Sequence, residues 1–202
     1  MLKTEGKHLD EVLDNIDDLE RRITDSFDLL GGKALNEKDF KILRKSLKDK
    51  YGVELKILNE YSSYEKLPIT KGGKTKWIKA KELYADWNKR NVAGKFHEGP
   101  PPMIILRNDI KGSIKASELT TFHEMVHMNV WLSGKKMNLI DEEIFVFEEI
   151  FKVRDKFKWT DAELIDSYDY VNKVIKDSGK NRPKYNNEFL EQLKINKQFN
   201  FR

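Results

Sequence analysis

Residues 121–127 read Thr-Phe-His-Glu-Met-Val-His and contain two histidines four positions apart. Apolar residues recur around them at helical spacing, which predicts a helix over about 115–132. Positions i and i+4 lie on one face of an α-helix, one turn apart. His123 and His127 can therefore direct two imidazole nitrogens to one point, which is half of a tetrahedral zinc site. Glu124 can take a proton from a water molecule there and return it to a leaving amine.

A zinc site with an open position needs a third protein ligand. The chain has no cysteine, and its other histidines are His8 and His97; we expect His97 to be a surface residue in a loop. The next predicted helix, over about 141–154, has an apolar face, with Glu143 inside it and Glu148 at its edge. A carboxylate in an apolar face is costly unless a cation neutralises it. Glu143 is therefore the favoured third ligand, and Glu148 is the alternative.

Two further glutamates of this predicted helix, Glu142 and Glu149, point largely away from its apolar face on the same helical wheel. Nothing in the sequence gives them a partner. We expect them to form a solvated face of the helix.

The composition is that of a very polar globular domain, with 36% charged and 39% apolar residues and a net charge of +4. No dense arginine tract or basic–aromatic stripe occurs, so nucleic-acid binding is not favoured. The absence of cysteine excludes disulfides and cysteine-ligated zinc. No apolar run reaches transmembrane length and the N-terminus has no signal-peptide core. We expect a soluble chain with no membrane span.

Periodicity and breaker residues divide the chain into three regions. We expect an amphipathic helical extension over 1–34, one domain over 35–180 that carries the histidines, and a partly helical tail over 181–202. The extension contains a predicted helix over about 8–30 with near-heptad spacing of apolar residues.

Within the central region, two capping boxes each begin a helix: Asn36 with Asp39, and Thr160 with Glu163. The other elements follow from alternation, helical spacing and breakers. In chain order, we expect a helix ending at 52, a strand over 53–58, a loop over 62–76, a short helix over 77–90, a loop over 94–102, a buried strand over 103–107, the two helices described above, and a helix from 161 to about 177. This order predicts a mostly helical α+β fold with a small β-sheet.

Four pieces of this region are similar to a known group of proteins. They are Pro-Pro-Met-Ile-Ile-Leu-Arg at 101–107, Glu-Leu-Thr-Thr-Phe-His-Glu-Met-Val-His at 118–127, Glu-Ile-Phe-Val-Phe at 143–147, and Tyr-Val at 170–171. The segment from Pro101 to about Lys176 resembles the zincin-like metallopeptidase toxin domains at the C-terminal ends of bacterial polymorphic toxins.

The resemblance implies a zinc-dependent endopeptidase that cleaves a protein or peptide substrate. It also implies delivery into a target cell as the end of a larger secreted protein, with a cognate immunity protein as a partner. His123 and His127 match the family's metal positions, Glu124 matches its catalytic glutamate, and Glu143 matches an acidic position before an aromatic–Val pair.

In a zincin-type peptidase, the strand beside the active site offers its backbone edge to an extended peptide. The predicted strands at 103–107 and 53–58 are both candidates for this role, and each could equally be an ordinary core strand. Tyr168 or Tyr170 could stabilise an oxyanion, and the sequence does not choose between them.

Two other functions fit the sequence. A non-catalytic interaction or adaptor protein would use the predicted helix at 8–30, with a degenerate metal site or none. A purely structural metal site would need a fourth protein ligand in place of water. Asp141 or His97 would have to supply it.

Overall fold

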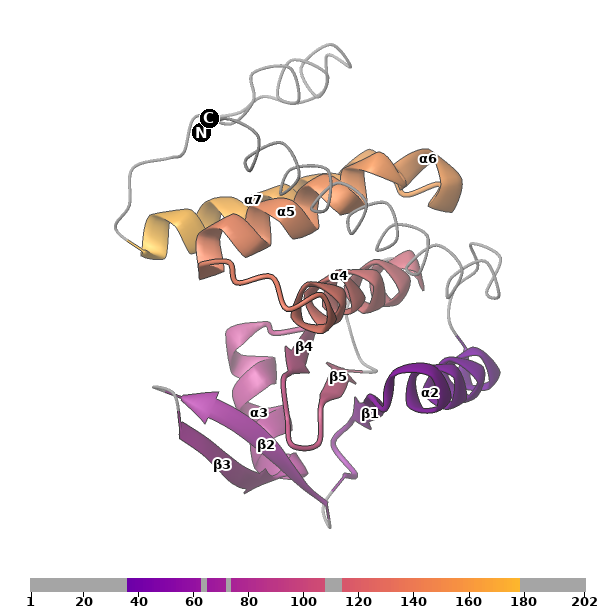
Figure 1. Ribbon diagram of the computed structural model, residues 1–202, viewed down its shortest axis with the longest axis vertical. Helices are drawn as coiled ribbons and strands as arrows, with labels where there is room; N and C mark the ends of the chain where they lie inside the picture. The colour runs from indigo at the N-terminus through magenta and orange to yellow at the C-terminus, as the bar shows by residue number, and fades with distance from the viewer. Residues whose placement is uncertain (1–35, 63–64, 72–73, 108–113, 179–202) are drawn as a thin grey trace, which may run out of the picture.

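A computed structural model of the chain describes residues 36–62, 65–71, 74–107 and 114–178. The predicted extension at 1–34, with the helix at 8–30 that the adaptor hypothesis uses, and the predicted tail at 181–202 lie outside these residues. In chain order, the described elements are α2 (Glu37–Tyr51), β1 (Glu54–Leu58), β2 (Lys66–Lys71), β3 (Lys74–Lys79), α3 (Ala80–Arg90), β4 (Gly94–His97), β5 (Met103–Arg107), α4 (Ile114–Leu132), α5 (Leu139–Lys152), α6 (Arg154–Phe157) and α7 (Asp161–Asp177) (Figure 1). The fold is α+β, as predicted.

The main sheet has three strands in the order β1-β5-β4. The central strand, β5, is parallel to β1 and antiparallel to β4. All five residues of β5 are buried, because elements pack on both faces of the sheet. This explains the continuous apolar run that predicted a buried strand.

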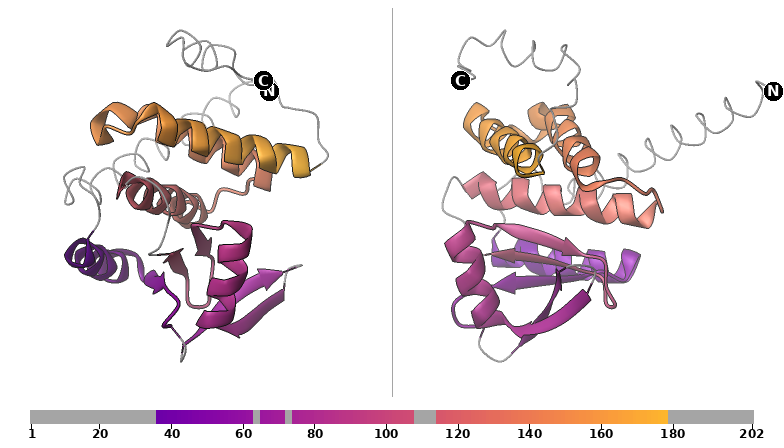
Figure 2. Two further views of the ribbon diagram at one scale, coloured as in Figure 1. Left: turned by 180° about the vertical axis from the view of Figure 1, so that it is seen from behind. Right: turned by 90° about the vertical axis from the view of Figure 1, so that its left-hand side faces the viewer.

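Helices α4, α5 and α7 form layers over one face of the main sheet (Figure 2). Helix α3 and the β2–β3 hairpin lie near the other face. The side chains of β5 alternate between two apolar clusters, as strand geometry requires. Ile104 and Leu106 join the cluster that includes α4, and Met103 and Ile105 join the cluster that includes α3. The strand therefore holds α4 at a fixed position over the sheet.

Both predicted capping boxes are confirmed. The Asn36 side chain accepts backbone hydrogen bonds at the start of α2, and Asp39 reaches back to the Asn36 amide. Thr160 and Glu163 make the same reciprocal pair at the start of α7. Four further elements are confirmed, with ends that differ from the prediction by no more than two residues. They are the strands predicted at 53–58 and 103–107 and the helices predicted around 115–132 and 141–154.

The predicted loop over 62–76 is wrong. Residues 66–71 and 74–79 form an antiparallel pair of strands, in which Pro68 lies opposite Trp77. Proline is compatible with this pair because each strand of a two-stranded sheet has an unpaired edge. The predicted helix from 77 consequently begins later, at Ala80, and Trp77 is a half-exposed strand residue rather than part of a helical core face.

The predicted loop over 94–102 is also wrong in its first half, where Gly94–His97 form β4. His97 is buried, at 5% exposure, and not a surface residue as expected. A four-residue strand that starts with glycine has too few alternating residues to give a sequence signal. Among the described helices, none has both the length and the hydropathy needed to cross a bilayer.

Candidate metal centre

His123 and His127 lie one turn apart on α4, and their rings meet above the helix. The two Nε2 atoms are 3.1 Å apart, and the ring centroids are 4.9 Å apart. Both side chains are largely buried, with 16% of His123 and 13% of His127 exposed. The neighbouring positions Phe122, Met125 and Val126 are fully buried in the core, so packing fixes the rotation of α4 and with it the direction of both imidazoles.

Helix α5 brings Glu143 to the two histidines. Its Oε2 lies 3.4 Å from His123 Nε2 and 3.6 Å from His127 Nε2. The candidate ligand atoms of the three residues all lie within 4.8 Å of one another. Glu148, the alternative third ligand, is half-buried and does not belong to this group. Of the two glutamates that the sequence offered, Glu143 is the one that meets both imidazoles.

The spacing of these donor atoms fits a zinc ion. Zinc bonds of about 2.0–2.1 Å at tetrahedral angles place neighbouring ligand atoms about 3.3 Å apart. The three distances in the structure, 3.1, 3.4 and 3.6 Å, lie around this value. Glu143 Oε2 is buried and accepts no well-formed hydrogen bond from the described residues. A buried carboxylate oxygen of this kind is costly unless a cation lies beside it.

The pKa values of His127 and Glu143 are both shifted in the direction that favours a cation between them. Burial, the largest influence, would lower the pKa of His127, but contacts with the Glu142 and Glu143 carboxylates outweigh it and raise the pKa to about 10. Burial would raise the pKa of Glu143, but contacts with His123 and His127 bring it down to about 2. The Glu142 and Glu143 carboxylates therefore stabilise a positive charge beside them, which either a proton on a histidine or a metal ion can supply.

We refer to His123, His127 and Glu143 as the metal group. Glu142 contacts this group at His127. Its Oε1 lies 2.7 Å from His127 Nδ1. An acceptor on Nδ1 keeps the proton on that nitrogen and leaves the Nε2 lone pair free for a metal. The prediction that Glu142 lies on a solvated face is therefore wrong. The helical wheel counted only the apolar face of α5 and could not show that α4 crosses beside it.

Glu149, also expected on the solvated face, is buried at 2% exposure. Its Oε1 accepts a hydrogen bond from Lys152 Nζ at 2.6 Å. The lysine, three residues later on the same helix, allows the carboxylate to be buried without a metal. Glu149 therefore belongs to the packing of α5 and not to the metal group.

Glu124 lies between α4 and β4, next to the metal group. It is 6% exposed, and its Oε2 accepts a hydrogen bond from the Phe96 amide at 2.5 Å. Burial raises the pKa of Glu124 above its usual value, against the opposing effect of the two histidines. A buried carboxyl group with a raised pKa is well matched to taking up and returning a proton.

Tyr170, on α7, is the tyrosine that reaches the metal group. Its hydroxyl donates to Glu143 Oε1 at 3.4 Å, and its ring meets the His123 ring edge-on at 5.7 Å. Burial of its hydroxyl end, followed by the charges of Glu143 and Glu124, raises the Tyr170 pKa, so the phenol remains a hydrogen-bond donor at neutral pH. Tyr168 instead packs in the core against Phe147. The structure thus distinguishes the two tyrosines that the sequence could not.

Neither residue considered as a fourth protein ligand joins the group. Among the described residues, the cluster that could hold a metal contains His123, His127 and Glu143 alone. Asp141 accepts a hydrogen bond from the Asn138 side chain at the start of α5. His97 is buried in β4. A metal ion held by these three residues would keep one tetrahedral position open for water.

The strand beside the metal group is β4, which the sequence did not predict. The predicted candidate β5 is paired on both sides and has no free edge. The other candidate, β1, is outermost on the far side of the sheet, where it packs with α2. Strand β4 is the outermost strand on the side that includes Glu124.

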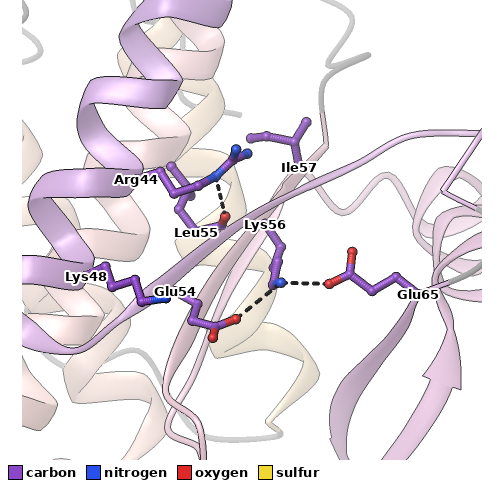
Figure 3. A pocket seen from close by; sticks show the side chains of 7 residues that line it. All are labelled: Arg44, Lys48, Glu54, Leu55, Lys56, Ile57 and Glu65. Atoms are coloured by element: carbon purple, nitrogen blue, oxygen red, sulfur yellow. Dashed lines mark hydrogen bonds and ion pairs between the residues drawn. The ribbon is translucent and has the colours of Figure 1, made fainter.

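A hollow of about 320 Å³ follows the outer edge of β1 (Figure 3). The charges in it are largely paired with one another. Lys56 Nζ lies 2.7 Å from Glu65 and 3.2 Å from Glu54, and Arg44 Nε donates to the Leu55 carbonyl at 3.0 Å. The Arg44 contact occupies a backbone acceptor that an added strand would need, which disfavours β1 as a peptide-binding edge.

A scan against protein-family models, a search of curated proteins and a search of solved structures find no match to this chain. The zincin-like resemblance therefore rests on the motifs quoted above alone.

Proposed function

We propose that the protein is a zinc-dependent endopeptidase. The observation that carries this proposal is the group of His123, His127 and Glu143 with the buried carboxyl of Glu124 beside it. Two histidines and one glutamate are a common ligand set of catalytic zinc in peptidases. When bound there, zinc would act as a Lewis acid on a carbonyl and lower the pKa of water.

Glu124 is the general base and acid of the proposed reaction. It takes a proton from the water that attacks the peptide carbonyl and returns it to the leaving amine. The Phe96 amide holds one carboxylate oxygen in place, so the carboxylate orientation is set before substrate binds. This hydrogen bond ties the catalytic residue to β4.

Tyr170 is a candidate for stabilising the developing oxyanion. Its hydroxyl is protonated, lies beside Glu143 and belongs to a side chain that is 47% exposed. A donor positioned where negative charge develops contributes mainly in the transition state. Tyr170 therefore takes the role that the sequence left open between two tyrosines.

The outer edge of β4 supports an extended peptide as the substrate. The backbone amide of Arg107 donates to the Ala93 carbonyl at 2.8 Å. In the antiparallel ladder, Lys95 therefore pairs with β5 by hydrogen bonds, whereas Gly94 and Phe96 point their backbone groups outward. The hydrogen bond from the Phe96 amide to Glu124 agrees with this alternation. An added strand could pair with the remaining outward groups.

A role as the toxin or effector part of a larger secreted bacterial protein, with a cognate immunity protein, is a further part of the proposal. It rests on the resemblance of the motifs alone. The chemistry proposed above does not depend on it.

The test of the proposed function is the Glu124→Gln variant. The amide keeps the size of the side chain but cannot act as a base, so the variant should bind zinc as the wild type does and lose cleavage of a denatured protein substrate. Cleavage is measured by mass spectrometry of the products, and zinc by elemental analysis. Undiminished cleavage by the variant would reject the mechanism.

A further inference from the structure

Two aromatic side chains lie together beside the metal group, one on α4 and one on β4. Trp131 is one helical turn beyond His127, and the Phe96 and Trp131 ring centroids are 5.7 Å apart with the rings tilted by 56°. Trp131 is 37% exposed, although the preceding turn of α4 is largely buried. We refer to Phe96 and Trp131 as the aromatic pair. Phe96 is partly buried against the main apolar cluster, so Trp131 provides most of the exposed apolar surface of the pair.

The contacts of β4 show which way this strand runs along α4. A side chain at Gly94 would meet Thr120 and Glu124, in the middle of the helix. Two residues later, Phe96 contacts Glu124 through its amide and Trp131 through its ring. Strand β4 therefore advances toward the C-terminal end of α4, past the metal group and toward Trp131.

This direction determines where each part of an added peptide would lie. Antiparallel pairing forms the more stable ladder, so a substrate strand on β4 would run from Trp131 toward Thr120. The bond to be cleaved must lie beside Glu124 and the two histidines. The residues on the N-terminal side of that bond therefore pass the aromatic pair.

We propose that Phe96 and Trp131 form a subsite for a large apolar or aromatic side chain on the N-terminal side of the cleaved bond. This inference rests on the proposed endopeptidase function and adds its substrate class. Aromatic rings offer a large rigid apolar surface, and a second aromatic ring packs on them by stacking or edge contacts. An acidic side chain would lose hydration there without gaining a partner from either ring.

The test uses a set of blocked peptides that differ at a single position and carry Phe, Leu, Ala or Asp there. Cleavage sites are mapped by mass spectrometry, and kcat/KM is measured for wild type, Trp131→Ala and Trp77→Ala. Trp77 is a matched control because it is a half-exposed tryptophan on β3, away from the metal group. Circular dichroism and zinc content of each variant show that the fold and the site remain.

For the wild type, kcat/KM for cleavage on the C-terminal side of Phe or Leu should be at least about 10-fold higher than for Ala. This is the discrimination expected of an apolar subsite. The Trp131→Ala variant should lose this preference, and Trp77→Ala should keep it. An unchanged preference in Trp131→Ala, or a preference set by the residue after the cleaved bond, would overturn the assignment while leaving the peptidase function intact.

Binding of the same peptides to the zinc-loaded Glu124→Gln variant gives a readout that does not depend on turnover. The Phe peptide should bind more tightly than the Asp peptide, and the added Trp131→Ala change should remove the difference. Equal binding of the two peptides counts against the subsite even if no cleavage is detected. Absent cleavage together with selective binding would reject the peptidase function alone.

Discussion

At the scale of single residues, the metal group depends on side chains that do not themselves contact a metal. Glu142 is the clearest of these, because its carboxylate contacts the outer nitrogen of His127, at 2.7 Å. Removing a carboxylate that orients a ligating histidine costs about 10- to 100-fold in metal affinity. We expect Glu142→Gln to weaken zinc binding by this factor, measured by competition with a chromogenic chelator. Glu148→Gln, on the same helix, is the control and should bind zinc as the wild type does.

Tyr170 makes a different prediction, because it is proposed to act on the reacting carbonyl and not on the metal. Tyr170→Phe keeps the ring beside His123 and removes the hydroxyl. Loss of one oxyanion donor lowers kcat by about 100-fold or more, whereas KM and zinc content should change little. A variant with unaltered kcat would remove Tyr170 from the mechanism.

At the scale of elements, the close approach of β4 to α4 is what holds Glu124 in place. A Cβ at Gly94 would lie 2.8 Å from Thr120 Cγ2, 2.9 Å from Leu106 Cδ2 and 3.1 Å from Glu124 Cγ. These contacts are too short, and overpacking of this kind costs about 1–3 kcal/mol. Gly94→Ala should therefore lower the free energy of unfolding in urea by that amount. Lys95→Ala, at the exposed neighbouring position, should leave it nearly unchanged.

The same elements show what the sequence could and could not predict. The helices with caps and long apolar stripes were predicted well, because their signals are local: the Asn36 and Thr160 boxes and the i, i+4 histidines are of this kind. Strand β4 was missed because it is short and is stabilised by pairing with β5. The β2–β3 hairpin is local, but its lysine-rich strands, one of which contains Pro68, obscured the alternation that signals a strand. Glu143 could be selected because its apolar neighbours made a carboxylate there costly. The roles of Glu142 and Tyr170 depend on how α5 and α7 pack against α4, and no local pattern carries that information.

At the scale of the whole molecule, the metal group joins two separate helices, α4 and α5, across the main apolar cluster. A ligand that binds only the folded state stabilises it, by about 2.7 kcal/mol at 100 times its dissociation constant. For a domain of this size, that corresponds to a rise in Tm of about 5–10 °C. We expect zinc to produce such a rise in the wild type, in a thermal melt followed by circular dichroism. The His127→Ala variant, which keeps α5 but lacks one ligand, should show no rise.

The zinc content of the purified protein tests the central claim most directly. It is measured by elemental analysis on four proteins side by side: wild type, His123→Ala, Glu143→Gln and Glu148→Gln. The geometry of the metal group predicts about one zinc per chain in the wild type and in Glu148→Gln, and a large loss in the other two. No zinc in the wild type after incubation with the metal, or equal zinc in all four proteins, would contradict the assignment of His123, His127 and Glu143 as the metal site.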